Sequence, residues 1–280
     1  MATSMATLQF MRNHILHLLV LCSSFSGVVL AQAQQQPTSK WQLVWSDEFD
    51  GTGKTDPIKW LYETGNSGSA KHEAQAYTDR VDNSYLEKGH LVIKALKEDF
   101  GDKHYTSARL NTRQSWTYGR FEFRAKFPRG RGTWPAAWML PEGQIYGDGY
   151  WPDNGEIDVL EAVGFEPNVN HFSIHTKDFN WMNNNQPTFL TLVPDAEQSF
   201  HTYALEWYPD HLDFFIDQKK YMTVEKKGDW RQWPFDQKFH LILNLAIGGS
   251  WGGMQGIDDQ IFPATFEFDY VRVYKLVPDS

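Results

Sequence analysis

One stretch of the chain reads Trp151-Pro152-Asp153-Asn154-Gly155-Glu156-Ile157-Asp158-Val159-Leu160-Glu161, and its last six residues set three carboxylates among apolar side chains. Side chains of a regular strand alternate between two faces, so Glu156 and Asp158 share a face and Glu161 points to the other. One extra residue, a β-bulge near Val159–Leu160, returns Glu161 to the first face. The stretch therefore predicts a bulged strand that carries three acids on one side.

Three acids on one face repel one another and destabilise the fold. Their presence therefore indicates that they have a function. The chemistry that best accounts for them is cleavage of a bond between two sugars, which uses two carboxyl groups flanking that bond. A bare Glu-x-Asp-x-x-Glu is more often a solvated acidic face or part of a cation site. The neighbouring Trp151 and Pro152 favour the chemical interpretation, because a solvated strand has no need of tryptophan beside its acids.

The pattern along the chain is strand after strand, broken by glycine, proline, aspartate and asparagine. Apolar residues alternate with charged ones over 121–127, a hairpin is expected around Pro209-Asp210-His211, and 240–247 is a continuous apolar run typical of an inner strand. No long amphipathic helix is expected. The pattern favours an all-β, two-sheet sandwich.

The motifs resemble glycoside hydrolase family 16, in the laminarinase-like branch with a bulged active-site strand. A sister branch, with lichenases and xyloglucan transglycosylases, has one residue fewer between its last two acids. The resemblance is carried by residues 151–161 together with segments upstream, 118–126 and 132–140, and downstream, 201–207, 243–249 and 269–274. It implies a β-sandwich jelly roll whose curved concave sheet carries a substrate cleft.

By this resemblance, Glu156 is the nucleophile and Glu161 the acid/base, with Asp158 sharing a proton or hydrogen bond with Glu156. Such a pair implies a retaining double displacement through a covalent glycosyl-enzyme, without a cofactor for catalysis. The implied activity is an endo-glucanase acting on internal bonds of β-1,3-glucan, and also on mixed β-1,3/1,4-glucan.

Further side chains are candidates for substrate binding. His175 resembles a family histidine beside the acid/base, and we expect it to bond to the sugar or to tune Glu161; a structural role is the alternative. Arg109 is expected to bond to the glycan, with an ion pair to a neighbouring acid as its alternative. Four tryptophans are expected to stack on sugars: Trp134, Trp138, Trp151, which can instead support the catalytic strand, and Trp251 on a glycine-rich loop.

The resemblance also implies a structural calcium on the convex face, away from catalysis. The matching positions are Glu48, the carbonyl of Gly89, and Asp269. Oxygen ligands from distant segments would tie the two ends of the domain together. A solvated acid is the alternative for each carboxylate.

The beginning of the chain has the features of a leader. An apolar stretch ends at Ala31-Gln32-Ala33, so residues 1–33 are predicted to be a secretory signal peptide, 34–40 a flexible lead-in and 41–280 a single domain. Cys22, the only cysteine, permits a lipoprotein alternative, and its place in the leader leaves the mature protein without a disulfide. We expect an extracellular or periplasmic enzyme.

Charge and composition limit the partners. The formal net charge is −9, which disfavours nucleic acid and anionic membranes, and 12 Trp and 12 Tyr suit a neutral polysaccharide such as β-glucan. We expect a monomer.

Three alternatives remain open: the same chemistry on a marine galactan (agar, porphyran or carrageenan), a non-catalytic β-glucan-recognition protein, and a transglycosylase. The loop at 68–75 departs from laminarinases, because it keeps Glu73 but lacks their tryptophan. Substrate preference is thus less firmly predicted than reaction type.

Overall fold

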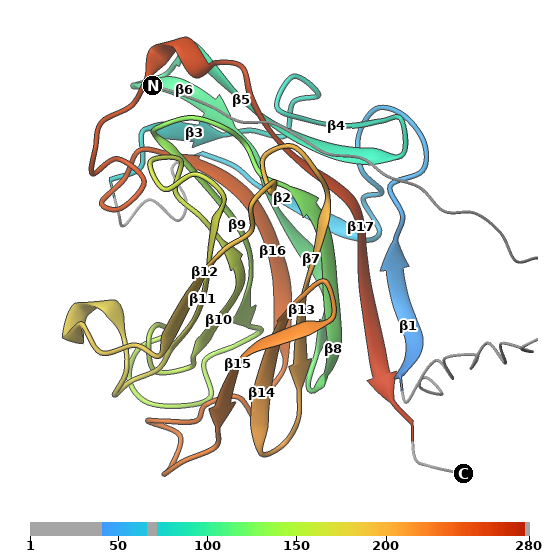
Figure 1. Ribbon diagram of the computed structural model, residues 1–280, viewed down its shortest axis with the longest axis vertical. Helices are drawn as coiled ribbons and strands as arrows, with labels where there is room; N and C mark the ends of the chain where they lie inside the picture. Colours follow the sequence, from blue (N-terminus) through green and yellow to red (C-terminus); the bar gives the residue numbers. More distant parts are fainter. Residues whose placement is uncertain (1–40, 66–71, 278–280) are drawn as a thin grey trace, which may run out of the picture. The chain divides into compact units, whose positions relative to one another are not determined.

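A computed structural model describes residues 41–65 and 72–277 (Figure 1). The predicted signal peptide and lead-in lie outside the described residues. Within the described part of the chain, no helix is long and apolar enough to cross a membrane.

The described residues form two sheets that face each other as two layers (Figure 1). The seven-stranded sheet has the order β12-β11-β10-β9-β16-β7-β2. Its strands are β2 (Trp60–Glu63), β7 (Arg109–Trp116), β9 (Thr133–Pro141), β10 (Glu156–Glu161), β11 (Val169–His175), β12 (Thr188–Leu192) and β16 (Phe239–Ile247).

The ten-stranded sheet has the order β15-β14-β13-β8-β17-β5-β6-β3, with β1 paired to β17 and β4 to β5. Its strands are β1 (Trp41–Asp47), β3 (Gln75–Tyr77), β4 (Ser84–Glu87), β5 (His90–Phe100), β6 (Lys103–Ser107), β8 (Gly119–Lys126), β13 (His201–Trp207), β14 (His211–Ile216), β15 (Lys219–Glu225) and β17 (Ala264–Leu276). Two short 3₁₀ helices, η1 (Trp181–Asn183) and η2 (Asp259–Ile261), complete the described elements. The all-β sandwich expected from the sequence is confirmed.

The core lies between the sheets and is rich in aromatic side chains. In β8, Phe121 and Phe123 are fully buried, and the residues between them face outward, as the alternation predicts. Trp207 of β13 and Phe239 of β16 pack edge to face between the two sheets, with ring centroids 5.4 Å apart. Burying each such side chain contributes about 2–3 kcal/mol, which holds the sheets in register.

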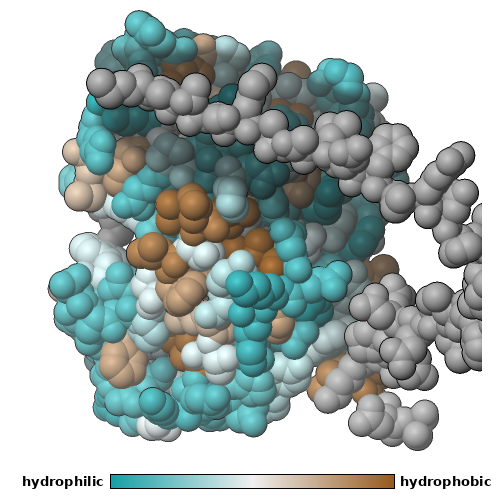
Figure 2. Space-filling view, viewed as in Figure 1, coloured by the Kyte–Doolittle hydropathy of each residue, from teal (hydrophilic) through white to brown (hydrophobic). Residues whose placement is uncertain are grey.

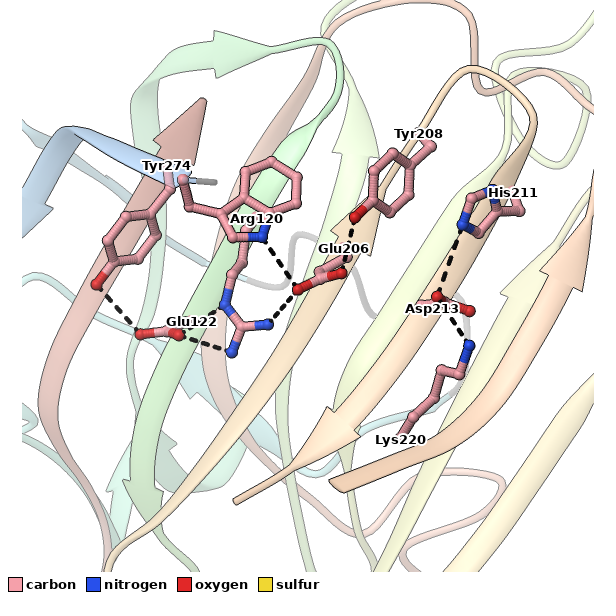
Figure 3. Close-up of polar contacts among 9 residues, drawn as sticks. Arg120, Glu122, Glu206, Tyr208, His211, Asp213, Lys220 and Tyr274 are labelled. Carbon is pink, nitrogen blue, oxygen red and sulfur yellow. Dashed lines mark hydrogen bonds and ion pairs between the residues drawn. The ribbon is translucent and has the colours of Figure 1, made fainter. Parts of the chain in front are cut away.

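The outer face of the ten-stranded sheet carries a polar network (Figure 3). Arg120 of β8 is 12% exposed and pairs with Glu122 at 2.8 Å and with Glu206 of β13 at 2.7 Å. Tyr208 donates to Glu206 at 2.9 Å, and Tyr274 of β17 donates to Glu122 at 3.3 Å. This network joins β8, β13 and β17 on the face opposite the core, and leaves the other sheet to carry the acids of the 151–161 motif.

Candidate active site

The bulge predicted in the acidic strand is present in β10. Glu156 lies opposite His175 and Asp158 opposite Ser173 on β11, after which the register shifts and Glu161 lies opposite His171. Val159 and Leu160 are both fully buried, so the extra residue is accommodated on the core side. The three acids therefore share the outer face of the seven-stranded sheet.

A glycine fixes how the chain enters β10. Gly155 has a φ of +89°, and a Cβ there would lie 2.8 Å from Pro234 Cγ and 2.9 Å from a ring carbon of Phe235. Both the left-handed conformation and the close approach require glycine. This turn delivers Glu156 to the first position of the strand.

Glu156 and Asp158 form one cluster with Trp151 and His175. Trp151 Nε1 donates to Glu156 Oε2 at 2.7 Å, so this indole does support the catalytic strand. His175 Nε2 lies 3.5 Å from Asp158 Oδ2 and 3.8 Å from Glu156 Oε1. The shared face thus brings the nucleophile candidate and its neighbouring acid into direct contact with an imidazole.

Burial raises the pKa of Asp158 well above its usual range, and the charges of Glu156 and Glu161 and a hydrogen bond with Glu156 act in the same direction. The raised pKa favours the protonated form of Asp158, which can share its proton with Glu156 in that hydrogen bond. The negative charge of the pair concentrates on Glu156, as a nucleophile requires.

Glu161 has the proton affinity of an acid catalyst at neutral pH. Burial raises its pKa to about 7, while a hydrogen bond from Trp134 Nε1 to Oε1, 2.8 Å long, opposes the shift. One face of one strand thus presents a carboxylate and a protonated carboxylic acid. This division of roles is what cleavage of a glycosidic bond needs.

Aromatic rings surround the acids on the same face. Trp134 and Trp138 come from β9, and Trp251 lies edge-on to Trp134 with ring centroids 5.7 Å apart. Trp181 of η1 is 46% exposed and stacks on Trp151 at 6.0 Å. Together they offer flat apolar surfaces beside the acids.

Comparisons with known proteins agree with this geometry. Residues 69–272 match the family described as glycosyl hydrolases family 16. The chain belongs to this family. It is 48% identical over 272 residues to a β-glucanase from Rhodothermus marinus, with 94% of this chain and 93% of the relative covered.

Solved structures extend the family match to three dimensions. The X-ray structure of the laminarinase from Rhodothermus marinus has a TM-score of 0.84 at 51% identity and covers 85% of this chain and 98% of that one. The structure of SCLam, a non-specific endo-β-1,3(4)-glucanase of family GH16, has a TM-score of 0.80 at 42% identity, covering 85% and 92%. The fold is thus the family-16 jelly roll, and the chain is a glycoside hydrolase.

His175 does not lie opposite Glu161, so its expected place beside the expected acid/base was wrong, whereas its bonding to the sugar stays a prediction. It contacts Glu156 and Asp158, whereas His171 is the histidine opposite Glu161. His171 Nε2 contacts Glu166 at 3.0 Å, and its ring meets Trp251 edge-on at 4.8 Å. The period of two from His175 would have indicated His171, since both must face the same side of β11.

Arg109 makes the ion pair that was its alternative. It pairs with Glu63 of β2 at 2.8 Å, and its guanidinium lies 5.0 Å from the ring centroid of Trp138. The Arg109 guanidinium therefore packs against one side of the Trp138 ring.

A buried polar relay behind Trp138 was not predicted. Trp138 Nε1 donates to Asn244 Oδ1 at 2.7 Å, Asn244 Nδ2 donates to the Tyr77 hydroxyl at 3.1 Å, and Tyr77 donates to Glu73 at 3.3 Å. Gln75 donates to the same Glu73 oxygen at 2.6 Å. An asparagine inside the apolar run of β16 was the available signal. Of the departing loop at 68–75, residues 68–71 lie outside the described residues.

The implied calcium positions are engaged with arginines. Glu48 forms a two-point ion pair with Arg272 at 2.7 and 3.0 Å, which lowers the pKa of Glu48, and Asp269 pairs with Arg124 at 2.5 Å. Calcium binding at these positions would require both ion pairs to open. Calcium binding through Glu48, Gly89 and Asp269 stays a prediction.

Proposed function

We propose that the protein hydrolyses internal β-1,3-glucosidic bonds of laminarin-type glucans, and also mixed β-1,3/1,4-glucan, with retention of configuration. The observation that carries the proposal is the bulge that brings the carboxyl groups of Glu156 and Glu161 to one face of β10. Burial raises the pKa of Glu161 to about 7, and burial with the neighbouring charges raises the pKa of Asp158 beside Glu156. One acid and one nucleophile are then available together at neutral pH.

In the first step, Glu161 gives its proton to the glycosidic oxygen as the bond to the sugar carbon breaks. The Glu156 carboxylate attacks that carbon and forms a glycosyl ester, while the leaving chain departs with the proton as a hydroxyl. In the second step, Glu161, now a carboxylate, takes a proton from water. The resulting hydroxide attacks the same carbon and releases Glu156.

The rings around the acids support a neutral glucan as substrate. The exposed Trp181 and the half-buried Trp134, Trp138 and Trp251 offer faces against which sugar C–H groups pack. The net charge of −9 disfavours the sulfated galactans among the alternatives. The names of the β-glucanase and laminarinase relatives point to the same class of polymer.

The test is to incubate the purified protein with laminarin, mixed-linkage glucan, agarose and carrageenan, and to follow reducing ends and product sizes. Short oligosaccharides from laminarin are expected, with proton NMR of the first products showing the β-anomer. Cleavage of agarose or carrageenan alone would overturn the substrate, and an initial α-anomer would overturn retention. Tight laminarin binding without cleavage would support the recognition protein, and longer products in the presence of added oligosaccharide would support the transglycosylase.

We also propose that the enzyme acts outside the cytoplasm as a monomer. The leader-like composition of residues 1–33 and the polymeric substrate support export. Amino-terminal sequencing of the protein recovered from the culture medium or periplasm tests cleavage after Ala33 or Ala31, and light scattering tests the monomer.

A further inference from the structure

The cluster at the start of β10 offers three ligand atoms of mixed type. One atom each of Glu156, Asp158 and His175 lie within 4.8 Å of one another. Among residues 41–65 and 72–277, this is the one group of three such side chains so close together. Two oxygens and one imidazole nitrogen therefore converge on the outer face of the seven-stranded sheet.

The spacing suits a small divalent ion. Bonds of about 2.0–2.1 Å around a tetrahedral zinc ion place neighbouring ligand atoms about 3.4 Å apart. His175 Nε2 lies 3.5 Å from Asp158 Oδ2 and 3.8 Å from Glu156 Oε1. The edge between His175 and Asp158 already has this length, and the edge between His175 and Glu156 needs to shorten by a few tenths of an ångström. The third edge, between Glu156 and Asp158, lies within 4.8 Å and closes by rotation of the glutamate side chain.

A buried oxygen points into this position. The Asp158 side chain is only 4% exposed, and within the described part of the chain its Oδ2 accepts no hydrogen bond from an N–H or hydroxyl group. Trp151 binds Oε2 of Glu156, so Oε1 is the oxygen that faces His175. A cation bound there would replace the proton that Asp158 shares with Glu156, and it would leave the Trp151 contact in place.

The ligand types select the metal. Imidazole nitrogen with carboxylate oxygen is a zinc ligand set, and three protein ligands plus water is a common arrangement. Calcium and magnesium prefer six or more oxygen ligands, so they fit this set poorly. Glu156 is 17% exposed, which leaves a side of the site open to water from the cleft.

We propose that Glu156, Asp158 and His175 form a zinc-binding site, and that zinc bound there reversibly inhibits the enzyme. The ion takes the Glu156 oxygen lone pair that would attack the sugar, and it occupies the space where the reacting carbon must approach. Zinc and glucan therefore exclude each other. The inhibition rests on the proposed hydrolytic function, whereas the metal binding does not.

The first measurement is calorimetric titration of the whole protein with zinc chloride in a non-coordinating buffer without substrate. Uptake of one zinc ion that is abolished by His175→Gln is expected. The matched control is His201→Gln, because His201 also lies between two acids, Asp195 at 3.1 Å and Asp217 at 2.6 Å, but belongs to β13. This control should retain the zinc ion.

The second measurement is laminarin hydrolysis against zinc concentration, each variant being compared with its own rate without zinc. The half-inhibitory concentration should rise about tenfold or more in His175→Gln, as expected for loss of a direct ligand, and change less than about twofold in His201→Gln. Equal concentrations of magnesium or calcium should not inhibit, and a chelator should restore activity.

Absence of zinc uptake at about millimolar zinc chloride would overturn the proposal, as would equal zinc uptake by His175→Gln. Should His175→Gln be too slow to assay, anomalous scattering at the zinc edge from zinc-soaked crystals decides. A peak between Glu156, Asp158 and His175 is expected, and a peak at His201 alone would contradict the site. Zinc uptake by a protein that cleaves no glucan would overturn the proposed function and leave the metal site standing.

Discussion

Glu161 lies directly opposite His171 across β10 and β11, at the position that Leu160 would occupy in an unbroken register. Glu156 lies opposite His175, so six residues of β10 span five of β11. The added residue is what allows an acid at each end of β10 to reach the same face. The bulge therefore determines the geometry of the candidate site, because it sets both acids and both histidines on one face of the sheet.

Replacing either outer acid should stop turnover without unfolding the protein. We expect Glu161→Gln to lower kcat on laminarin by about 10²–10⁴-fold, the range for loss of a general acid, and Glu156→Gln to lower it at least as much. An aryl glucoside whose leaving group needs no proton should recover activity with Glu161→Gln but not with Glu156→Gln. Glu87→Gln, at an exposed position, is the control. Near-normal laminarin hydrolysis by either variant would refute the roles assigned to these acids.

The alkaline limb of the pH profile should report Glu161. Its pKa of about 7 means that the proton needed by the leaving group is present below pH 7 and lost above it, so kcat/KM should fall about tenfold per unit at higher pH.

Trp134→Phe should move this limb to higher pH. The indole N–H stabilises the Glu161 carboxylate, so removing it raises the pKa further. Trp251→Phe is the control, because Trp251 contacts Trp134 by ring packing alone. A limb that moves to lower pH in Trp134→Phe, or equally in both variants, would contradict the assignment.

The sequence predicts those features of the site that depend on neighbouring residues within one strand. It does not predict contacts between strands that are distant in the sequence. The bulge follows from a local pattern, since a spacing of three positions between Asp158 and Glu161 puts the last acid out of phase. The sandwich follows similarly from local alternation, as in β8. These features are properties of one strand at a time.

The neighbour of His175 was mispredicted because strand pairing is not local. In an antiparallel pair the later residue of one strand meets the earlier residue of the other, so His175 faces Glu156 and not Glu161. The relay from Trp138 through Asn244 to Tyr77 joins β9, β16 and β3, whose proximity is set by topology. Periodicity within β11 places His171 and His175 on one face, but it does not indicate which acid each histidine meets.

Tyr77→Phe should weaken both the fold and substrate binding. It removes the hydroxyl between Asn244 and Glu73, leaving buried polar atoms without a partner, which costs about 1–3 kcal/mol of unfolding free energy. With Asn244 released, Trp138 is held less firmly and KM for laminarin should rise more than kcat falls.

Tyr203→Phe provides the matched control for this relay. Tyr203 is equally buried, but its hydroxyl has no hydrogen-bond partner among the described residues, so its loss should leave stability unchanged or raise it. Urea denaturation of both variants makes the comparison. Equal destabilisation by the two substitutions would show that the relay contributes nothing beyond packing.

The network of Figure 3 should matter for stability and not for catalysis. Arg120→Met leaves Glu122 and Glu206 facing each other without their shared cation, and breaking such a largely buried pair costs about 3 kcal/mol. We expect a lower urea midpoint with kcat and KM unchanged at temperatures where the variant is folded, because Arg120 lies on the sheet that does not carry the acids.

Adding Glu206→Gln should recover part of the loss by removing one of the two facing charges. Arg231→Met, at an exposed pair with Asp229, should change stability by less than about 0.5 kcal/mol. A loss of kcat in folded Arg120→Met would instead show that the two sheets are coupled through the core.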